Sequence, residues 1–193
     1  MNDLVQAELK KIFNGRFSTS VSTRTTYARG EDTYDPILSK AVVFPETNEE
    51  VSKILKLCNQ HKIPVVPFGT GTSLEGNVVG NEKGITISLE KMNKILSVNV
   101  EDFDCRVQAC VTKEQLNDYL REDGVFFPID PGANAAIGGM ASTSASGTMA
   151  VKYGTMKTVI SGLTVVLPNG DIINTGSRTK KTSAGYNLTN LFI

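Results

Sequence analysis

A short run of glycines and hydroxyl residues, placed directly after an expected strand, is the first part of the sequence that could bind a ligand. Residues 66–76 read Val-Pro-Phe-Gly-Thr-Gly-Thr-Ser-Leu-Glu-Gly. Closely spaced glycines let successive backbone N–H groups turn toward one point, and the hydroxyls add donors, which together suit phosphate oxygens. The run has neither the lysine of a P-loop nor the glycine spacing of a Rossmann fingerprint. It predicts a pyrophosphate-binding loop, with a tight turn that binds nothing as the alternative.

A second run of small residues follows the sequence Asp130-Pro131-Gly132. Between positions 132 and 150, 15 of 19 residues are Gly, Ala, Ser or Thr, which leaves little side-chain volume to fill a core. This composition predicts that a large flat ligand, such as a flavin with its sugar chain, lies against the backbone. A close contact between a helix and a sheet is the alternative.

The elements that would position the first run form a strand, helix, strand and strand pattern. Strands are expected over 41–44, 63–67 and 84–88, the first two parallel and in one sheet. A helix over 48–61 begins with the capping box Thr47-Asn48-Glu49-Glu50 and carries apolar residues at helical spacing.

The remaining elements complete an α+β chain without repeats. A surface helix over 3–13, packing through Leu4, Leu9, Ile12 and Phe13, precedes a loop over 14–36. Strands are expected over 94–100 and 104–111, and a helix with the buried stripe Leu116, Tyr119 and Leu120 begins at a second capping box, Thr112 to Gln115. A hairpin over 160–173 turns at Asn169-Gly170. We expect three segments: residues 1–36, a lobe over 37–92 and a second lobe over 93–193.

Composition excludes several classes of function. The chain has 193 residues with 20 basic and 20 acidic side chains, so a nucleic-acid or anionic-membrane surface is not expected. No apolar run is long enough to span a membrane, there is no export signal, and three cysteines without paired spacing indicate reduced thiols, which predicts a cytoplasmic chain. The one histidine, His61, at the expected end of a helix, cannot build a catalytic triad or a histidine metal site.

Two charged groups are weaker candidates. A solvated acidic turn, in preference to a metal site, is expected at Glu101, Asp102 and Asp104. A solvent-exposed basic loop is expected at Arg178, Lys180 and Lys181, with contact to a cofactor phosphate as the alternative.

The small-residue runs occur together and in order with further motifs. These are Pro67 to Gly76, Asp130-Pro131-Gly132, Ile137-Gly138-Gly139, Ser144 to Gly147, Tyr153-Gly154-Thr155, Leu163 to Gly170, and Ser183 to Phe192. The set resembles the FAD-binding domain of the vanillyl-alcohol oxidase and p-cresol methylhydroxylase superfamily. Within it, the D-lactate dehydrogenase and glycolate oxidase D-subunit group is most similar.

The resemblance implies a two-lobed α+β fold of p-cresol methylhydroxylase type, with the FAD pyrophosphate on 68–76 and the flavin and ribityl end along 130–146. Neither run contains His or Cys, so FAD is expected to be held without a covalent bond. The cofactor-binding residues that the resemblance implies are Phe68, Gly69, Thr70, Gly71, Thr72, Ser73, Leu74, Gly76, Asp130, Pro131, Gly132, Ala133, Ile137, Gly138, Gly139, Ser142, Thr143, Ser144, Ala145, Tyr153 and Gly154.

The implied activity is oxidation of a small 2-hydroxy acid, D-lactate or glycolate, by hydride transfer to the flavin. Members of this group continue into a segment that completes the cofactor site and then into a cap domain that holds the substrate. The chain is therefore expected to be an N-terminal portion, completed by a missing C-terminal region or by a partner chain, and its catalytic base is not visible. The alternative is a truncated, non-catalytic flavin-binding or interaction module.

Overall fold

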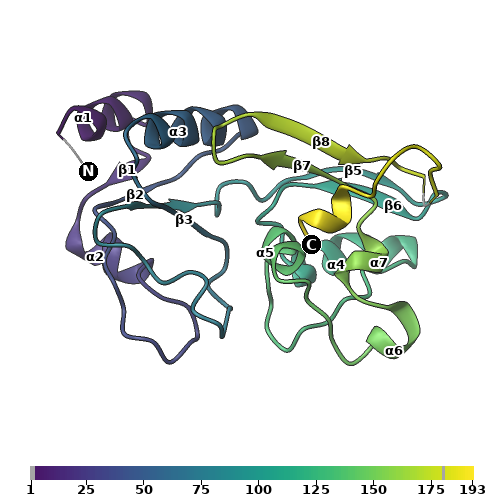
Figure 1. Ribbon diagram of the computed structural model, residues 1–193. Helices are drawn as coiled ribbons and strands as arrows, with labels where there is room; N and C mark the ends of the chain where they lie inside the picture. Colours follow the sequence, from purple (N-terminus) through teal and green to yellow (C-terminus); the bar gives the residue numbers. More distant parts are fainter. Residues whose placement is uncertain (1–2, 180) are drawn as a thin grey trace. The chain divides into compact units, whose positions relative to one another are not determined.

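A computed structural model describes residues 3–179 and 181–193 and divides the chain into two compact units (Figure 1). The first unit comprises the chain up to Met92 together with Val166–Ile172, and the second comprises Asn93–Val165 and Ile173–Ile193. Among the described residues, no helix has both the length and the apolar character needed to cross a membrane.

The first unit is built on a four-stranded sheet. The strands are β1 (Phe17–Ser18), β2 (Ala41–Val43), β3 (Val65–Phe68) and β4 (Ile85–Ser88), in the spatial order β1-β2-β4-β3. Both β2 and β3 run parallel to β4, while β1 is antiparallel to β2. The predicted strands and their parallel arrangement are therefore confirmed, and β4 lies between β2 and β3, the strands that precede and follow the helix over 48–60.

Two helices, α1 (Asp3–Ile12) and α3 (Asn48–Gln60), cover one face of this sheet (Figure 1). Helix α3 confirms the predicted span and buries Ile54 and Cys58 against inward-facing strand residues. In α1 the predicted packing face was half wrong. Val5, Leu9 and Phe13, which repeat every four residues, are buried, whereas Leu4 and Ile12 are exposed.

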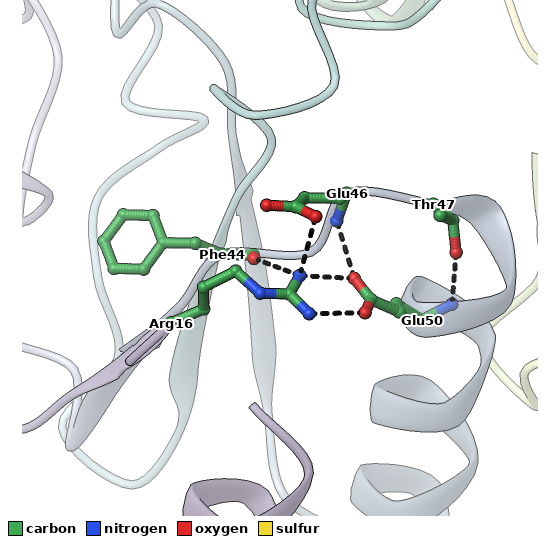
Figure 2. A network of polar contacts seen from close by, with 5 residues as sticks. All are labelled: Arg16, Phe44, Glu46, Thr47 and Glu50. Carbon is green, nitrogen blue, oxygen red and sulfur yellow. Dashed lines mark hydrogen bonds and ion pairs between the residues drawn. The ribbon is translucent and has the colours of Figure 1, made fainter. Parts of the chain in front are cut away.

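An ion-pair network joins the first turn of α3 to Arg16, the residue immediately before β1 (Figure 2). The Thr47 hydroxyl accepts the Glu50 N–H at 3.2 Å, as the capping box predicts. In a full capping box the Glu50 carboxylate would accept the Thr47 N–H. Here it accepts the Glu46 N–H at 2.7 Å and pairs with both terminal nitrogens of Arg16 at 2.6 Å. Arg16 also donates to the Phe44 carbonyl at 3.1 Å. These bonds hold the pKa of Glu50 below its ordinary value, chiefly through the hydrogen bonds from Arg16.

The predicted loop over 14–36 contains two elements that the sequence did not indicate. These are β1 and the short helix α2 (Val21–Thr26), whose N-cap Ser20 accepts the Thr23 N–H. Helix α2 buries none of its residues, so it has no apolar periodicity that a sequence pattern could reveal. Farther along, the hydroxyl of buried Thr86 donates to that of Ser39 at 2.8 Å.

The second unit surrounds a separate core. Strands β5 (Ile95–Asn99) and β6 (Asp104–Val107) pair in antiparallel fashion. They are followed by α4 (Lys113–Leu120), the 3₁₀ turn η1 (Arg121–Asp123), α5 (Ile137–Ser142), α6 (Ala150–Tyr153) and α7 (Met156–Val159). Strand β6 is shorter than predicted because the chain turns after Val107. The buried stripe of α4 was partly wrong, since Leu116 and Leu120 are buried but Tyr119 is exposed.

The predicted hairpin is present as β7 (Gly162–Val166) and β8 (Ile172–Gly176), with a final 3₁₀ turn, η2 (Thr189–Leu191), farther on. Its tip belongs to the first unit. There Gly170, with φ of +85°, makes the turn, and its carbonyl accepts the buried Ser52 hydroxyl of α3 at 2.5 Å. One side-chain hydrogen bond thus fastens the hairpin tip to a helix that lies 118 residues earlier in the chain.

Candidate cofactor-binding site

The loop that follows β3 requires glycine at its centre. Gly71 has φ of +74°, and a Cβ there would lie 2.7 Å from Cζ of Phe68. The Phe68 side chain cannot easily move, because the residue is 7% exposed and its ring stacks edge-on against Tyr27 with centroids 5.0 Å apart. The Phe68 ring therefore packs directly against Gly71, whose positive φ makes the turn.

The same loop presents hydrogen-bond donors without protein partners. Within the described residues, the backbone N–H groups of Gly71, Thr72 and Ser73 donate no hydrogen bond. All three residues are partly exposed, and the hydroxyls of Thr70 and Thr72 lie 3.4 Å apart beside them. Unsatisfied N–H groups around a positive-φ glycine fit the oxygens of a phosphate group. The residues present therefore suit the pyrophosphate of a dinucleotide.

The second candidate segment borders an open depression of about 720 Å³ in the second unit. Its lining residues are Lys113, Asp130, Pro131, Gly132, Ser146, Gly147 and Thr148. Four of these, Lys113, Ser146, Gly147 and Thr148, were not among the predicted cofactor-binding residues, although Ser146, Gly147 and Thr148 lie within the predicted run of small residues. Tertiary structure brings Lys113 to this segment, because its backbone N–H donates to the Ala135 carbonyl at 3.1 Å, and no sequence signal could have found it.

Asp130 is fixed within this depression. Its carboxylate accepts the Thr148 hydroxyl at 2.8 Å and the Met149 N–H at 3.1 Å. These two donors, Thr148 first, hold the pKa of Asp130 below its ordinary value, so the group is an ionised acceptor at neutral pH. A Cβ on Gly147 would lie 2.3 Å from the Asp130 carbonyl oxygen, which explains that glycine by packing alone.

The neighbouring glycines of α5 have different surroundings. A Cβ on Gly138 would lie 2.8 Å from both Cβ and the carbonyl oxygen of Ala109, to which the Gly138 N–H donates. A Cβ on Gly139 would meet no atom within 4 Å, and the same holds for Gly132. Close packing therefore accounts for Gly138, whereas Gly132 and Gly139 leave open backbone that a ligand can approach.

Several other predicted residues of this segment make contacts within the protein. Ser142 and Thr143 donate their hydroxyls to the carbonyls of Gly138 and Gly139, at 3.0 and 3.1 Å, which leaves only acceptor capacity for a ligand. The Tyr153 ring stacks edge-on against Phe126, with centroids 5.6 Å apart. Ile137 is buried in the core, and Ser144 has φ of +49°.

The predicted binding residues fall into both units. Residues 68–76 belong to the first unit, and residues 130–154 belong to the second.

The weaker candidates have structural partners. Arg178 donates to the carboxylates of Asp104 and Asp102 at 2.7 and 2.5 Å, which holds the pKa of Asp104 below its ordinary value. The acidic turn is therefore ion-paired, and Lys180 lies outside the described residues. His61 is exposed and forms the C-cap of α3, as predicted.

Comparisons with known proteins agree with this geometry. A family described as FAD binding domain matches residues 39–176. The chain is 48% identical over 179 residues to a probable mitochondrial D-lactate dehydrogenase of Danio rerio, covering 91% of this chain and 36% of that protein. It is 43% identical over 189 residues to the mitochondrial D-lactate dehydrogenase (cytochrome) of Arabidopsis thaliana, covering 97% and 33%. Glycolate oxidase subunit GlcD of Bacillus subtilis is 35% identical, with 92% and 38% covered.

Solved structures support the fold class predicted from the sequence. Substrate-bound p-cresol methylhydroxylase superposes with a TM-score of 0.82 at 26% identity, over 98% of this chain and 40% of that one. An alkyldihydroxyacetonephosphate synthase shares the fold, with a TM-score of 0.87 at 21% identity, over 100% and 37%. The chain thus spans about a third of the length of the curated relatives cited above. The resemblance drawn from the sequence motifs is confirmed, and the chain belongs to the family of FAD-binding domains of p-cresol methylhydroxylase type.

Proposed function

We propose that this chain is the FAD-binding portion of a flavoenzyme that oxidises a small 2-hydroxy acid, D-lactate or glycolate, to the 2-oxo acid. The names of the relatives support the substrate class. The observation that carries the binding role is the set of unpartnered N–H groups of Gly71, Thr72 and Ser73, within the described residues, around a glycine that no other residue can replace without strain.

In this proposal the loop over 68–76 holds the pyrophosphate, and the segment over 130–154 lies along the flavin and ribityl end. Open backbone at Gly132 and Gly139 gives a flat ring room to approach. Attachment is proposed to be non-covalent, because neither segment contains His or Cys. Lys113, which lines the depression beside Asp130, is proposed as an additional positive charge near the cofactor.

When bound, FAD supplies the acceptor for the hydride that leaves the substrate α-carbon. Asp130 accepts two hydrogen bonds and stays ionised, which makes it a positioning group and not a proton donor. The catalytic base and the groups that hold the substrate carboxylate are proposed to lie in the part of the relatives that this chain does not match. In the alternative arrangement, a partner chain supplies them. The compartment is proposed to be a reducing one; the sequence predicts the cytoplasm, although two of the cited relatives are named as mitochondrial.

Titration with FAD tests the binding proposal directly. We expect quenching of FAD fluorescence on binding, and release of the flavin into the supernatant after acid precipitation. No quenching would refute the binding role, and flavin that stays with the precipitate would refute non-covalent attachment.

Anaerobic reduction tests the substrate class. With FAD bound, the chain alone is expected to give no more dye reduction with D-lactate or glycolate than free FAD does, because positioning and general-base groups each supply orders of magnitude in rate. Co-expression with the downstream reading frame of the same locus is expected to produce D-lactate or glycolate oxidation. Failure there would favour the alternative, a non-catalytic flavin-binding or interaction module. Rapid turnover by the chain alone would place the catalytic groups within these residues.

A further inference from the structure

Residues 28–34, here called the bracing turn, contact the loop over 68–76 at Gly71, Ser73 and Gly76. The Glu31 N–H donates to the Gly71 carbonyl at 2.9 Å. The Gly80 N–H, beyond the other end of the loop, donates to the Ala28 carbonyl at 2.9 Å. The bracing turn precedes the residues 39–176 that match the FAD binding domain family, so the family match does not account for it.

Two residues of the bracing turn contact the loop closely. A Cβ on Gly30 would lie 2.6 Å from the Gly71 carbonyl oxygen and 2.9 Å from that of Ser73, so the two backbones are packed as tightly as glycine allows. The Tyr34 ring occupies the space beside Gly76, where a Cβ would lie 2.7 Å from Cδ2 of that ring. The turn therefore fixes the loop at Gly71 and again at Gly76.

One buried carboxylate holds both contact residues in place. Asp32 is 8% exposed, and its Oδ2 accepts the Gly30 N–H at 3.0 Å while its Oδ1 accepts the Tyr34 N–H at 3.0 Å. In the described part of the chain no cation pairs with Asp32, and its bonds go to the backbone of the turn. A buried carboxylate is costly unless its hydrogen bonds are made, so these two bonds define one conformation of the turn.

We propose that Asp32 is a positioning residue that presets the loop over 68–76 for a phosphate-bearing ligand. It acts through Gly30 and Tyr34 and does not itself contact the ligand. This inference rests on the proposed function, because it assigns the phosphate groups of FAD to that loop. Without Asp32 the loop must become ordered when the ligand binds. The conformational entropy lost in that step makes the binding free energy less favourable.

The test compares Asp32→Ala and Asp32→Asn with the matched control Asp35→Ala. Asp35 is exposed and, among the described residues, makes no hydrogen bond. Asp32→Ala is expected to weaken FAD and ADP binding by about tenfold or more, because it removes both hydrogen bonds that the Asp32 carboxylate accepts from the turn. Asp32→Asn keeps one oxygen acceptor and should lie between the parent and Asp32→Ala. Riboflavin, which has no phosphate, should bind all four proteins equally.

Amide hydrogen exchange separates this inference from the proposed function. Exchange at Glu31 and Gly80 should be faster in Asp32→Ala than in the parent and unchanged in Asp35→Ala, whether or not the parent binds FAD. Unchanged exchange, unchanged FAD affinity in both Asp32 variants, or an equal loss of FAD and riboflavin binding would overturn the positioning role. If Asp32→Ala does not fold, the same comparisons are made with Asp32→Asn.

Discussion

The substitution Gly71→Ala tests the phosphate loop most directly. An L-residue with φ near +74° pays about 1–2 kcal/mol of backbone strain. The new Cβ would also lie 2.7 Å from Cζ of Phe68, and relieving such an overlap in a packed site costs about 1–3 kcal/mol. The loop conformation that leaves the three N–H groups of Gly71, Thr72 and Ser73 without partners in the described residues is therefore disfavoured by about 2–5 kcal/mol, and we expect FAD affinity to fall by at least about thirtyfold. Gly71→Val should bind at least as weakly.

Fluorescence quenching of FAD measures this loss, and Gly15→Ala provides the matched control. Gly15 has nearly the same φ, +76°, but a Cβ there would meet no atom within 4 Å. Gly15→Ala should therefore lower the free energy of unfolding by about 1–2 kcal/mol while leaving FAD affinity unchanged. Parental FAD affinity in Gly71→Ala would remove this loop from the site. Equal losses of affinity in the two variants would show that general destabilisation, and not loop geometry, controls binding.

Glu50, Ser52 and the two neighbouring glycines of α5 give three further predictions. Glu50→Gln should lower the free energy of unfolding at neutral pH by about 1–2 kcal/mol. It should also flatten the fall in that energy between about pH 5 and 3, as urea denaturation would show. Because the folded-state pKa of Glu50 is depressed, its contribution is present above the unfolded-state pKa and is lost as the pH falls through the folded-state value. Ser52→Ala should cost about 1 kcal/mol in the same assay, and no loss would mean that the bond to the hairpin tip contributes nothing. Gly138→Ala should cost about 1–3 kcal/mol of stability. Gly139→Ala should leave stability within about 0.5 kcal/mol yet weaken FAD binding, and unaltered FAD affinity would place the flavin elsewhere.

Elements with local signals were predictable from the sequence. Helix α3 begins at a capping residue and carries an apolar face, and its neighbouring strands are short apolar runs ended by turn residues, so their spans were found. Helix α2 buries nothing and β1 has two residues, so neither carries a pattern. The buried face of α1 was misassigned because Val5 and Leu4 are adjacent and equally apolar, and only the sheet below decides which one is buried.

The contribution of the bracing turn could not be predicted, for a different reason. A sequence of Gly, Glu, Asp, Thr and Tyr with an early aspartate is typical of any polar loop, and the usual interpretation is solvent exposure. Asp32 is buried because its two acceptor oxygens are satisfied by its own backbone, and the loop that it supports lies about 40 residues later. Only tertiary structure brings these segments together.

The small-residue stretch shows most clearly what composition can and cannot decide. Two causes favour small residues, close packing and ligand clearance, and the sequence from 132 to 150 contains both without distinguishing them. Gly147 lies against Asp130 and Gly138 lies against Ala109, so close packing within the protein requires glycine at both positions. Gly132 and Gly139 face open space, where a larger side chain would disturb nothing in the protein itself. A glycine that no packing contact requires indicates a ligand site, because the absence of a side chain matters there only when a ligand approaches the backbone. Glycines of both kinds occur in α5 and in the loops on either side of it. The flavin hypothesis is therefore limited to a few backbone positions, which single substitutions can test one at a time.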